Sequence, residues 1–361
     1  MENVAIQSLY NIPVHPQELY PRLEWDRDVI VLGIESTAHT FGVGIASTKP
    51  PFILADARSV YRPEKGGIHP REAASHHTRK APEVLREALE YSGLGVRDVD
   101  AIAVALGPGL GPALRVGATI ARGLSVYFGK KLVPVNHAVA HLEIGKLVTG
   151  MKDPLILYVS GGNTTVTALA QGKYRVFGET LDIALGNLLD TFARDVGLAP
   201  PYIVEGMHVV DRCAEDADEP VLLPYVVKGM DVSFSGLLTA AERMWEKASS
   251  REKPRICLGL REAAYGATIE VAERGVAHTK KKEVLLTGGV AASPILRDKF
   301  RVMASYQRVR PGYPPARLSG DNGAMIAWTG LLYYLLGVAI RVEESSVKQR
   351  WRIDAVDTPW L

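Results

Sequence analysis

The sequence predicts an α/β protein built from two similar halves with a cleft between them. Three observations support this prediction: a strand pair of one design occurs twice, helical patterns alternate with apolar strands, and glycine-rich turns follow the strands. Of the 361 residues, 47% are apolar and 23% are charged. This composition suits a buried core in each half and excludes a disordered chain, a collagen or a disulfide scaffold.

The repeated strand pair indicates where each half begins. In the first half, the runs VIVLGI and FGVGIAS are joined by the polar turn 35–40. In the second half, LILYVS and TTVTAL are joined by a Gly-Gly-Asn turn, and VLLT later precedes Gly288-Gly289 and a helical pattern. Between the pairs, 80–91 has the apolar spacing of a helix and 100–106 has the composition of a buried strand.

These elements predict the domain organisation. We expect an N-terminal extension over residues 1–27, a first lobe over 28–150 and a second lobe over 151–361. The final helix of the second lobe is free to pack back on the first lobe.

Cysteine content and apolar runs bear on compartment. Cys213 and Cys257 form no CxxC pair, and we expect small buried side chains in a reducing compartment rather than a disulfide or redox pair. The first 27 residues contain no apolar run suited to a signal peptide, so we expect a cytoplasmic protein. The uncharged stretch 323–340 has the minimum length of a membrane span, but its polar residues and the capping pair Asp321-Asn322 favour a buried helix.

Basic residues form local clusters in a chain of net charge +2, which predicts no overall attraction to nucleic acid. The clusters are Lys130-Lys131, Lys280-Lys281-Lys282, and Lys348 with Arg350 and Arg352. Most such runs are solvated faces, and this is the expectation for all three.

Two histidines have a spacing suited to metal binding. His137 and His141 follow the strand-like KLVPV, and a helix there places both imidazoles on one face, within reach of one metal ion. A third ligand must come from elsewhere, and the best candidate is Asp321, at a glycine-flanked helix entrance. Taken alone, such a histidine pair more often belongs to a surface or a packed core, so both interpretations stay open on spacing.

Peptidase chemistry meets a direct objection. A zinc peptidase of the HExxH type needs a glutamate after the first histidine to activate the metal-bound water, and Ala138 stands there. Glu35 or another distant carboxylate would have to substitute.

Glycine-rich turns after apolar strands indicate a nucleotide cleft. They lie at Gly33, 107–112, 160–163 and 288–289. Their backbone N–H groups are suited to phosphate oxygens, and neither a P-loop nor a GxGxxG motif is present. The carboxylates nearby, Glu35, Asp182 and Asp190, are suited to ribose hydroxyls or a metal, or equally to capping a helix or pairing with an arginine.

Eight motifs, in order, carry a resemblance to a known family. They are Gly33-Ile34-Glu35-Ser36-Thr37, GPGLGPALRVG (107–117), NHAVAH (136–141), YVSGGNT (158–164), GETLDIALGNLLD (178–190), KGMDVSFSGLLT (228–239), TGGVAAS (287–293) and GDNGAMIA (320–327). The set resembles the universal tRNA N6-adenosine threonylcarbamoyltransferase family, in the archaeal and eukaryotic form that is the catalytic subunit of the KEOPS complex. The resemblance extends from Val31 to Asp354.

The resemblance implies a fold and a set of site residues. Members have the two-lobed fold of actin, sugar kinases and Hsp70 ATPases, with a central cleft. His137, His141 and Asp321 correspond to the ligands of one divalent metal ion, iron or zinc, with Tyr158 sometimes counted among them. The positions that correspond to donor or nucleotide binding are Tyr158, Val159, Ser160, Gly161, Gly162, Asp190, Gly206, Asp211 and Ser293.

The chain departs from the family pattern at three places. A Pro-Gly-Gly-Pro-x-Ile-Glu segment is replaced by 200–211, in which Gly206 and Asp211 are the stand-ins. Ser293 replaces an asparagine and lacks its amide donor, which puts one nucleotide contact in doubt. The acidic residue that bacterial members carry after the first motif is absent, with His39-Thr40 in that region.

The resemblance also implies the reaction. The donor is threonylcarbamoyl-AMP, with ATP or AMP able to occupy the same cleft, and the acceptor is N6 of the adenosine next to the anticodon in tRNAs that read ANN codons. A metal at the histidines would polarise the carbamoyl carbonyl, and the 160–162 amides would hold the donor. Glu35 is a tentative catalytic residue, as acceptor of the amine proton or as an orienting carboxylate.

Partners and alternatives complete the expectations. The KEOPS resemblance implies tRNA, a kinase-like ATPase, a dimerising subunit docked on a first-lobe helix and a tRNA-binding subunit, with no membrane. A chain of charge +2 should bind tRNA weakly alone. The alternatives are an ATP-hydrolysing or phosphoryl-transferring enzyme of the same fold, a nucleotide-regulated scaffold, and a metal-dependent peptidase. The histidine pair disfavours the interpretation as a phosphoryl-transfer enzyme, because such enzymes bind magnesium through oxygen ligands.

Overall fold

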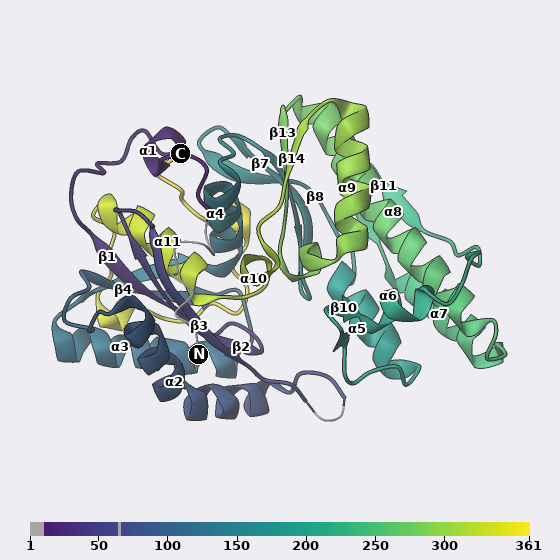
Figure 1. The fold of residues 1–361 in the computed structure, drawn as a ribbon, viewed down its shortest axis with the longest axis horizontal. Helices are drawn as coiled ribbons and strands as arrows, with labels where there is room; N and C mark the ends of the chain where they lie inside the picture. Colours follow the sequence, from purple (N-terminus) through teal and green to yellow (C-terminus); the bar gives the residue numbers. More distant parts are fainter. Residues whose placement is uncertain (1–10, 64–65) are drawn as a thin grey trace.

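Two five-stranded mixed sheets organise the computed structural model, which describes residues 11–63 and 66–361 (Figure 1). The first sheet, in the order β3-β2-β1-β4-β5, consists of β1 (Ile30–Glu35), β2 (Thr40–Ser47), β3 (Ile53–Val60), β4 (Ala101–Gly107) and β5 (Lys131–Asn136). The second sheet, in the order β14-β13-β6-β7-β8, consists of β6 (Leu155–Val159), β7 (Thr164–Ala170), β8 (Lys173–Glu179), β13 (Glu283–Thr287) and β14 (Arg310–Gly312).

The two sheets repeat one plan. In the first, β1 pairs antiparallel with β2 and parallel with β4, and in the second, β6 pairs antiparallel with β7 and parallel with β13. Both hairpins expected from the sequence are therefore present, and the duplicated α/β architecture is confirmed.

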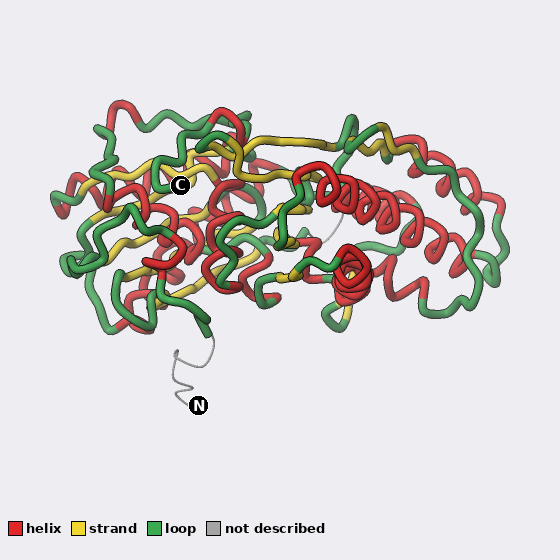
Figure 2. Tube along the Cα trace, turned by 90° about the horizontal axis from the view of Figure 1, so that it is seen from above, coloured by secondary structure: helices red, strands yellow, loops and turns green. Residues whose placement is uncertain are grey.

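Helices cover the sheets and fill the space between them (Figures 1 and 2). The first sheet carries α2 (Pro70–Ser92), α3 (Gly111–Phe128), α4 (His137–Thr149) and α11 (Gly323–Leu335). The second lobe contains α5 (Leu185–Asp195), α6 (Val209–Ala214), α7 (Ser235–Lys247), α8 (Lys253–Thr279) and α9 (Pro294–Gln307). The short elements are α1 (Pro16–Leu19), α10 (Ala316–Ser319), the strand pairs β9 (Ile203–Val204) with β10 (Met207–His208) and β11 (Val226–Lys228) with β12 (Asp231–Ser233), and the 3₁₀ turns η2 (Gly289–Ala292), η3 (Val342–Glu344) and η4 (Ile353–Ala355).

Alternation along β1 shows how the first sheet is buried on both faces. Val31 belongs to the core shared with α4 and α11, whereas Leu32 and Ile34 belong to the core under α2 and α3. Between them, a Cβ on Gly33 would lie 2.1 Å from the backbone nitrogen of Ala327 in α11. A glycine at this position therefore lets α11 lie directly on the sheet.

The apolar stretch that begins at residue 323 is a core helix, as the sequence predicts. Every residue of α11 from Gly323 to Tyr333 is buried, and the Asn322 side chain caps the helix by accepting from the Met325 N–H at 2.8 Å. Among the described residues, no helix has the length and apolar character needed to cross a bilayer.

Both ends of the described chain pack into the first core. In the predicted extension, Trp25 stacks on Trp328 of α11 at 5.9 Å between ring centroids, and Tyr20 is fully buried. Near the C-terminus, Trp360 is 1% exposed. The first ten residues of the predicted extension lie outside the described residues.

The expectation for the cysteines was wrong. Cys213 of α6 and Cys257 of α8 form a disulfide, with Cα atoms 5.9 Å apart. The sequence contains no CxxC spacing because the bridge joins two helices that meet only in the fold, 44 residues apart.

Loss of this disulfide should destabilise the second lobe. A bridge that closes a loop of 44 residues restricts the unfolded chain by about 4 kcal/mol in the chain-entropy model. We expect the Cys213→Ala/Cys257→Ala variant to unfold at a lower denaturant concentration than the oxidised protein, measured by circular dichroism. Under reducing conditions the two proteins should unfold together, and a gap that persists there would contradict the assignment.

Candidate active site

The helix that carries both histidines begins directly at the end of a strand. Asn136, the last residue of β5, caps α4 through a hydrogen bond from the Val139 N–H to its Oδ1 at 3.1 Å. His137 and His141 then follow one helical turn apart, with ring centroids separated by 4.8 Å. The predicted helical spacing is present at the C-terminal edge of the first sheet.

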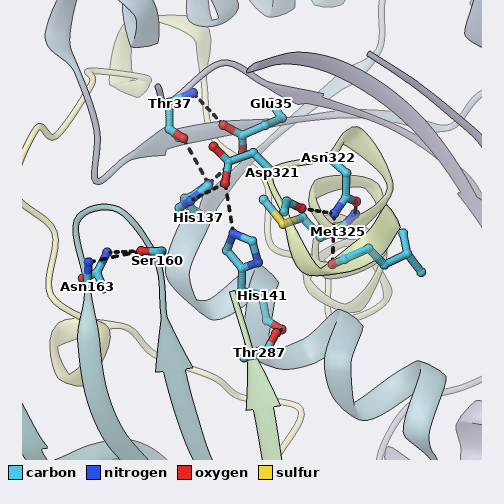
Figure 3. Close-up of polar contacts among 12 residues, drawn as sticks. Glu35, Thr37, His137, His141, Ser160, Asn163, Thr287, Asp321, Asn322 and Met325 are labelled. Carbon is cyan, nitrogen blue, oxygen red and sulfur yellow. Dashed lines mark hydrogen bonds and ion pairs between the residues drawn. The ribbon is translucent and has the colours of Figure 1, made fainter. Parts of the chain in front are cut away.

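The third candidate ligand comes from a distant part of the chain. Asp321 lies between α10 and α11, and its Oδ1 is 3.6 Å from Nε2 of His137 and 3.3 Å from Nε2 of His141 (Figure 3). The three ligand atoms lie within 4.8 Å of one another, which is the separation that one bound ion requires.

The other nitrogen of His137 is held by the end of β1. Nδ1 lies 2.8 Å from Oε2 of Glu35 and 3.2 Å from Oγ1 of Thr37, while Oε1 of Glu35 accepts from the Thr37 N–H at 2.6 Å (Figure 3). A carboxylate that accepts from Nδ1 fixes the imidazole plane and leaves Nε2 available to a metal. Both Glu35 oxygens are thus engaged in orienting neighbours.

Burial and neighbouring charges shift the pKa values of His137, His141 and Asp321 in different directions. Burial opposes protonation of His137, but the Glu35 and Asp321 carboxylates outweigh it and raise its pKa to about 9. Burial lowers the pKa of His141, so this ring stays neutral and suited to coordination. Burial opposes ionisation of Asp321, but His137 overcomes it and lowers the Asp321 pKa below its usual range.

Two buried polar atoms beside the proposed ligands also suit a metal site. Nδ1 of His141 and Oη of Tyr158 are buried atoms with no hydrogen-bond partner among residues 11–63 and 66–361, and their rings lie 5.3 Å apart. Burial also raises the pKa of the Tyr158 phenol. Two imidazoles, a carboxylate and an unpartnered phenol form a donor set that suits zinc or iron.

A first-lobe arginine holds the segment that carries Asp321. On β3, Nη1 of Arg58 donates to the Asp321 carbonyl at 3.1 Å, and Nη2 donates to the Arg317 carbonyl at 2.6 Å. The buried Asp56 carboxylate lies 3.6 Å from Nη2 of Arg58. This clamp fixes where Asp321 lies relative to the histidines on α4.

Removal of the clamp should weaken metal binding. We expect Arg58→Met to raise the metal dissociation constant about 10- to 100-fold, as outer partners of ligands do, measured by competition with a chromogenic chelator. Arg122→Met is the matched control, because Arg122 holds the Ser345 loop by a similar pair of bonds away from the metal ligands. Equal effects of the two substitutions on metal affinity would contradict this role.

The turn after β6 has the open backbone that an anionic ligand needs. Among the described residues, a Cβ on Gly162 would meet nothing within 4 Å, and one on Gly161 would meet only Asn187 Oδ1 at 3.8 Å. The turn is held by Ser160, whose Oγ accepts from the Asn163 N–H at 3.1 Å (Figure 3). Gly186, in the first turn of α5, donates its N–H to the Ser160 carbonyl at 3.2 Å. The turn therefore lies at the N-terminus of α5, and its residues Gly161 and Gly162 are exposed.

Two of the four predicted glycine turns are filled by the chain itself. Gly33 receives α11, and a Cβ on Gly107 would lie 1.9 Å from the carbonyl oxygen of Lys348. The Gly109 N–H donates to the Gln349 carbonyl at 3.2 Å. The 107–112 turn is thus a dock for the C-terminal segment, not an open phosphate cradle.

The predicted nucleoside residues fall into two hydrogen-bonded groups. Asp190 on α5 accepts from Nε2 of His208 at 3.1 Å and keeps 43% of its side chain exposed. Asp211 on α6 is fully buried and accepts from Tyr265 Oη at 3.0 Å and from Ser293 Oγ at 3.1 Å. Burial raises the Asp211 pKa. Of this set, only Asp190 presents a partly free carboxylate.

The remaining predicted residues have structural roles in a turn, in the core and in hydrogen bonds to the backbone. Gly206 is the exposed turn glycine between β9 and β10, with φ +81°. Val159 buries its side chain in the second core, so only its backbone faces the site. Asp182 accepts from the Phe234 and Ile183 N–H groups, which is a structural role. Sequence reasoning missed His208 and Tyr265, because neither stands in a recognisable motif.

Comparison with known proteins decides the family. A model of the TsaD family, described as tRNA N6-adenosine threonylcarbamoyltransferase, matches residues 53–328. The chain belongs to this family. A tRNA N6-adenosine threonylcarbamoyltransferase of Hyperthermus butylicus is 70% identical over 96% of this chain and 95% of that protein. One from Aeropyrum pernix is 57% identical over 93% of this chain and 95% of the relative. The chain is therefore a transferase that modifies tRNA, and the phosphoryl-transfer and peptidase alternatives are set aside.

Solved structures establish the fold of this family member. HypF of T. kodakarensis has a TM-score of 0.57 at 15% identity, covering 87% of this chain and 49% of that one. Component A of the Acidaminococcus fermentans (R)-2-hydroxyglutaryl-CoA dehydratase has a TM-score of 0.51 at 14% identity, covering 83% and 96%. The duplicated two-lobed architecture of actin-like ATPases, expected from the resemblance, is confirmed.

Proposed function

We propose that this enzyme takes the threonylcarbamoyl group from threonylcarbamoyl-AMP and transfers it to N6 of the adenosine next to the anticodon in tRNAs that read ANN codons. Family membership supports the tRNA modification. The observation that supports the proposed site is the convergence of His137, His141 and Asp321 within 4.8 Å, beside the open turn 160–162.

The open turn would hold the donor. The exposed backbone of Gly161 and Gly162, together with the positive end of the α5 dipole, favours the phosphate or carboxylate of threonylcarbamoyl-AMP. Asp190 would accept from the ribose hydroxyls, with His208 fixing its carboxylate. His208 Nδ1 accepts from the Val210 N–H, so the proton resides on Nε2 and points at Asp190. The buried Asp211 and Ser293 would support the pocket from behind.

The metal residues would act on the reacting carbonyl. His137, His141 and Asp321, with Tyr158 beside them, would hold one divalent cation, zinc or iron, which when bound supplies Lewis acidity to the carbamoyl oxygen. Glu35 would orient His137, because one of its oxygens lies 2.8 Å from Nδ1 of that imidazole while the other accepts from the Thr37 N–H. The N6 nitrogen would form a bond to the carbamoyl carbon, the bond from that carbon to the phosphate oxygen of AMP would break with its electron pair on that oxygen, and the amine proton would pass to solvent.

Partner subunits would complete the tRNA-binding surface, as in a KEOPS-like complex of a kinase-like ATPase, a dimerising subunit and a tRNA-binding subunit. A groove of about 420 Å³ between α2 and α3, lined by Ala81, Pro82, Val116 and Ile120, supports a helical partner on the first lobe. Exposed Tyr127 near the end of α3 adds apolar surface.

We place the enzyme in the cytoplasm, where its tRNA substrate resides. A disulfide in a cytoplasmic protein is consistent with this location, because intracellular proteins of hyperthermophiles contain disulfides.

An in vitro assay tests the proposal. Unmodified tRNA, threonylcarbamoyl-AMP, the partner subunits and the metal-loaded enzyme should yield threonylcarbamoyladenosine on nucleoside analysis of the tRNA. A tRNA whose target adenosine is replaced by guanosine should yield none. Absence of product with the natural tRNA, while the donor is intact, would contradict the proposed donor.

A further inference from the structure

The fold separates the three basic clusters that the sequence could not tell apart. Lys131 begins β5, and Lys280 and Lys282 directly precede β13, so two clusters lie where strands begin. The site residues lie where strands end: Glu35 closes β1, and His137 follows β5. Because β1, β4 and β5 are parallel to one another, as are β6 and β13, the beginnings and ends of these strands lie at opposite edges of their sheets.

The third cluster lies at the same edge as the site. The Lys348 N–H donates to the carbonyl of Leu106, near the end of β4, at 2.7 Å. Nδ2 of Asn136, the residue before His137, donates to the Trp351 carbonyl at 3.0 Å. Arg352 then pairs with Glu179, the last residue of β8, at 3.2 Å. The segment 348–352 therefore runs along the ends of β4 and β5 to the end of β8, from the first lobe to the second.

A short series of hydrogen bonds links the segment to the metal-binding residue His137. The Gly109 N–H donates to the Gln349 carbonyl, and the adjacent Leu110 N–H donates to the Thr37 carbonyl at 2.7 Å. The Thr37 hydroxyl lies 3.2 Å from Nδ1 of His137. The 107–112 turn therefore contacts both the segment 348–352 and the residues that follow β1. The segment can approach this turn closely because Gly107 has no Cβ.

Two cations of this segment have no acidic partner. Lys348 and Arg350 are exposed, and neither lies within ion-pair distance of a carboxylate in the part of the chain that the structure describes. Nζ of Lys348 lies over the Trp351 ring at 4.5 Å, which holds the ammonium in place without neutralising it. Arg352 is paired with Glu179 and Asp354 and anchors the segment. A rigid backbone with two free cations is suited to phosphate oxygens.

We propose that residues 348–352 form the phosphate-binding rim of the active site, on which the backbone of the substrate tRNA rests beside the target adenosine. The proposal rests on the family's tRNA substrate and names the surface of this chain that receives it. Phosphate contacts of this kind position a nucleic acid without reading its sequence, so the rim serves every tRNA that presents the adenosine. The clusters at Lys130-Lys131 and Lys280–Lys282 take no part.

The test compares two pairs of neutralising substitutions in the full-length chain. Lys348→Gln/Arg350→Gln removes the rim charges, and Lys280→Gln/Lys282→Gln removes two exposed cations at the opposite edge of the second sheet. With the partner subunits present, binding of unmodified tRNA is measured at several salt concentrations, together with product formation at saturating tRNA; metal content and thermal unfolding are measured on each variant.

We expect the rim variant to bind tRNA about tenfold or more weakly at 0.1 M salt, with a salt dependence reduced by about two ions, because each lost phosphate contact releases about one counterion fewer. Product formation at saturating tRNA, metal content and unfolding temperature should match the unsubstituted enzyme. The opposite-edge variant should bind tRNA as the unsubstituted enzyme does.

Three results would overturn the proposal. Unchanged tRNA affinity of the rim variant would show that no phosphate rests there. Equal weakening by both variants would indicate a general effect of charge. Loss of product at saturating tRNA with unchanged binding would make the segment a structural support of the site. An unsubstituted enzyme that binds tRNA but forms no product would instead contradict the proposed reaction and leave the rim in place.

Discussion

Replacement of His141 by alanine should remove the metal from the enzyme and reduce product formation by at least about 10³-fold, which corresponds to about 4 kcal/mol of transition-state stabilisation. His141 is fully buried, lies 3.3 Å from the Asp321 carboxylate and is kept neutral by burial. Without His141, only His137 and Asp321 of the three proposed ligands remain, and two protein ligands are too few to retain a divalent cation at catalytic affinity. Metal content by mass spectrometry and nucleoside analysis measure the two losses.

The control for this experiment is His278→Ala, which removes an exposed imidazole from the end of α8. We expect full metal content and full activity in that variant. If His141→Ala retained its metal stoichiometry, or lost its metal and kept its activity, the assignment of the site would be wrong.

Glu143→Ala should destabilise the protein by about 3–5 kcal/mol. Glu143 is fully buried on α4, accepts from the phenols of Tyr20 and Tyr174 at 2.7 and 2.6 Å, and accepts from Nε1 of Trp360 at 3.0 Å. It also lies 3.5 Å from Nζ of Lys146, which is 1% exposed. Alanine leaves three buried donors and one buried ammonium without their acceptor. Denaturant unfolding followed by tryptophan fluorescence measures the loss.

Two companion variants make the result specific. Glu143→Gln keeps an oxygen acceptor and should cost less than alanine. Glu83→Ala removes a glutamate whose ion pair with Lys80 is exposed, and it should leave the free energy of unfolding nearly unchanged. Equal effects of Glu143→Ala and Glu83→Ala would contradict the importance of the buried network.

Local patterns made much of the fold predictable. Alternation and turn residues identified both hairpins, and helical spacing placed His137 and His141 on one face. The capping residue Asn322 and the mixed composition of the stretch after it identified α11 as a core helix. Each of these signals depends on residues close together in the sequence.

Non-local contacts could not be predicted in this way. The acceptor Glu143 gathers Tyr20, Tyr174 and Trp360 from three distant segments, and no spacing rule links them. The bridge from Cys213 joins two helices that become neighbours only in the folded chain. The filling of the 107–112 turn by the C-terminal segment is of the same kind. A glycine pattern shows that close approach is possible, but it does not show whether a ligand or the chain itself approaches.

The position of the bound metal tests the account most directly. An anomalous difference map from crystals of the metal-loaded enzyme should show one strong peak within about 2.0–2.2 Å of an imidazole nitrogen of His137, an imidazole nitrogen of His141 and a carboxylate oxygen of Asp321. A peak bound elsewhere on the chain, or one that contacts the histidines but not Asp321, would contradict the proposed centre.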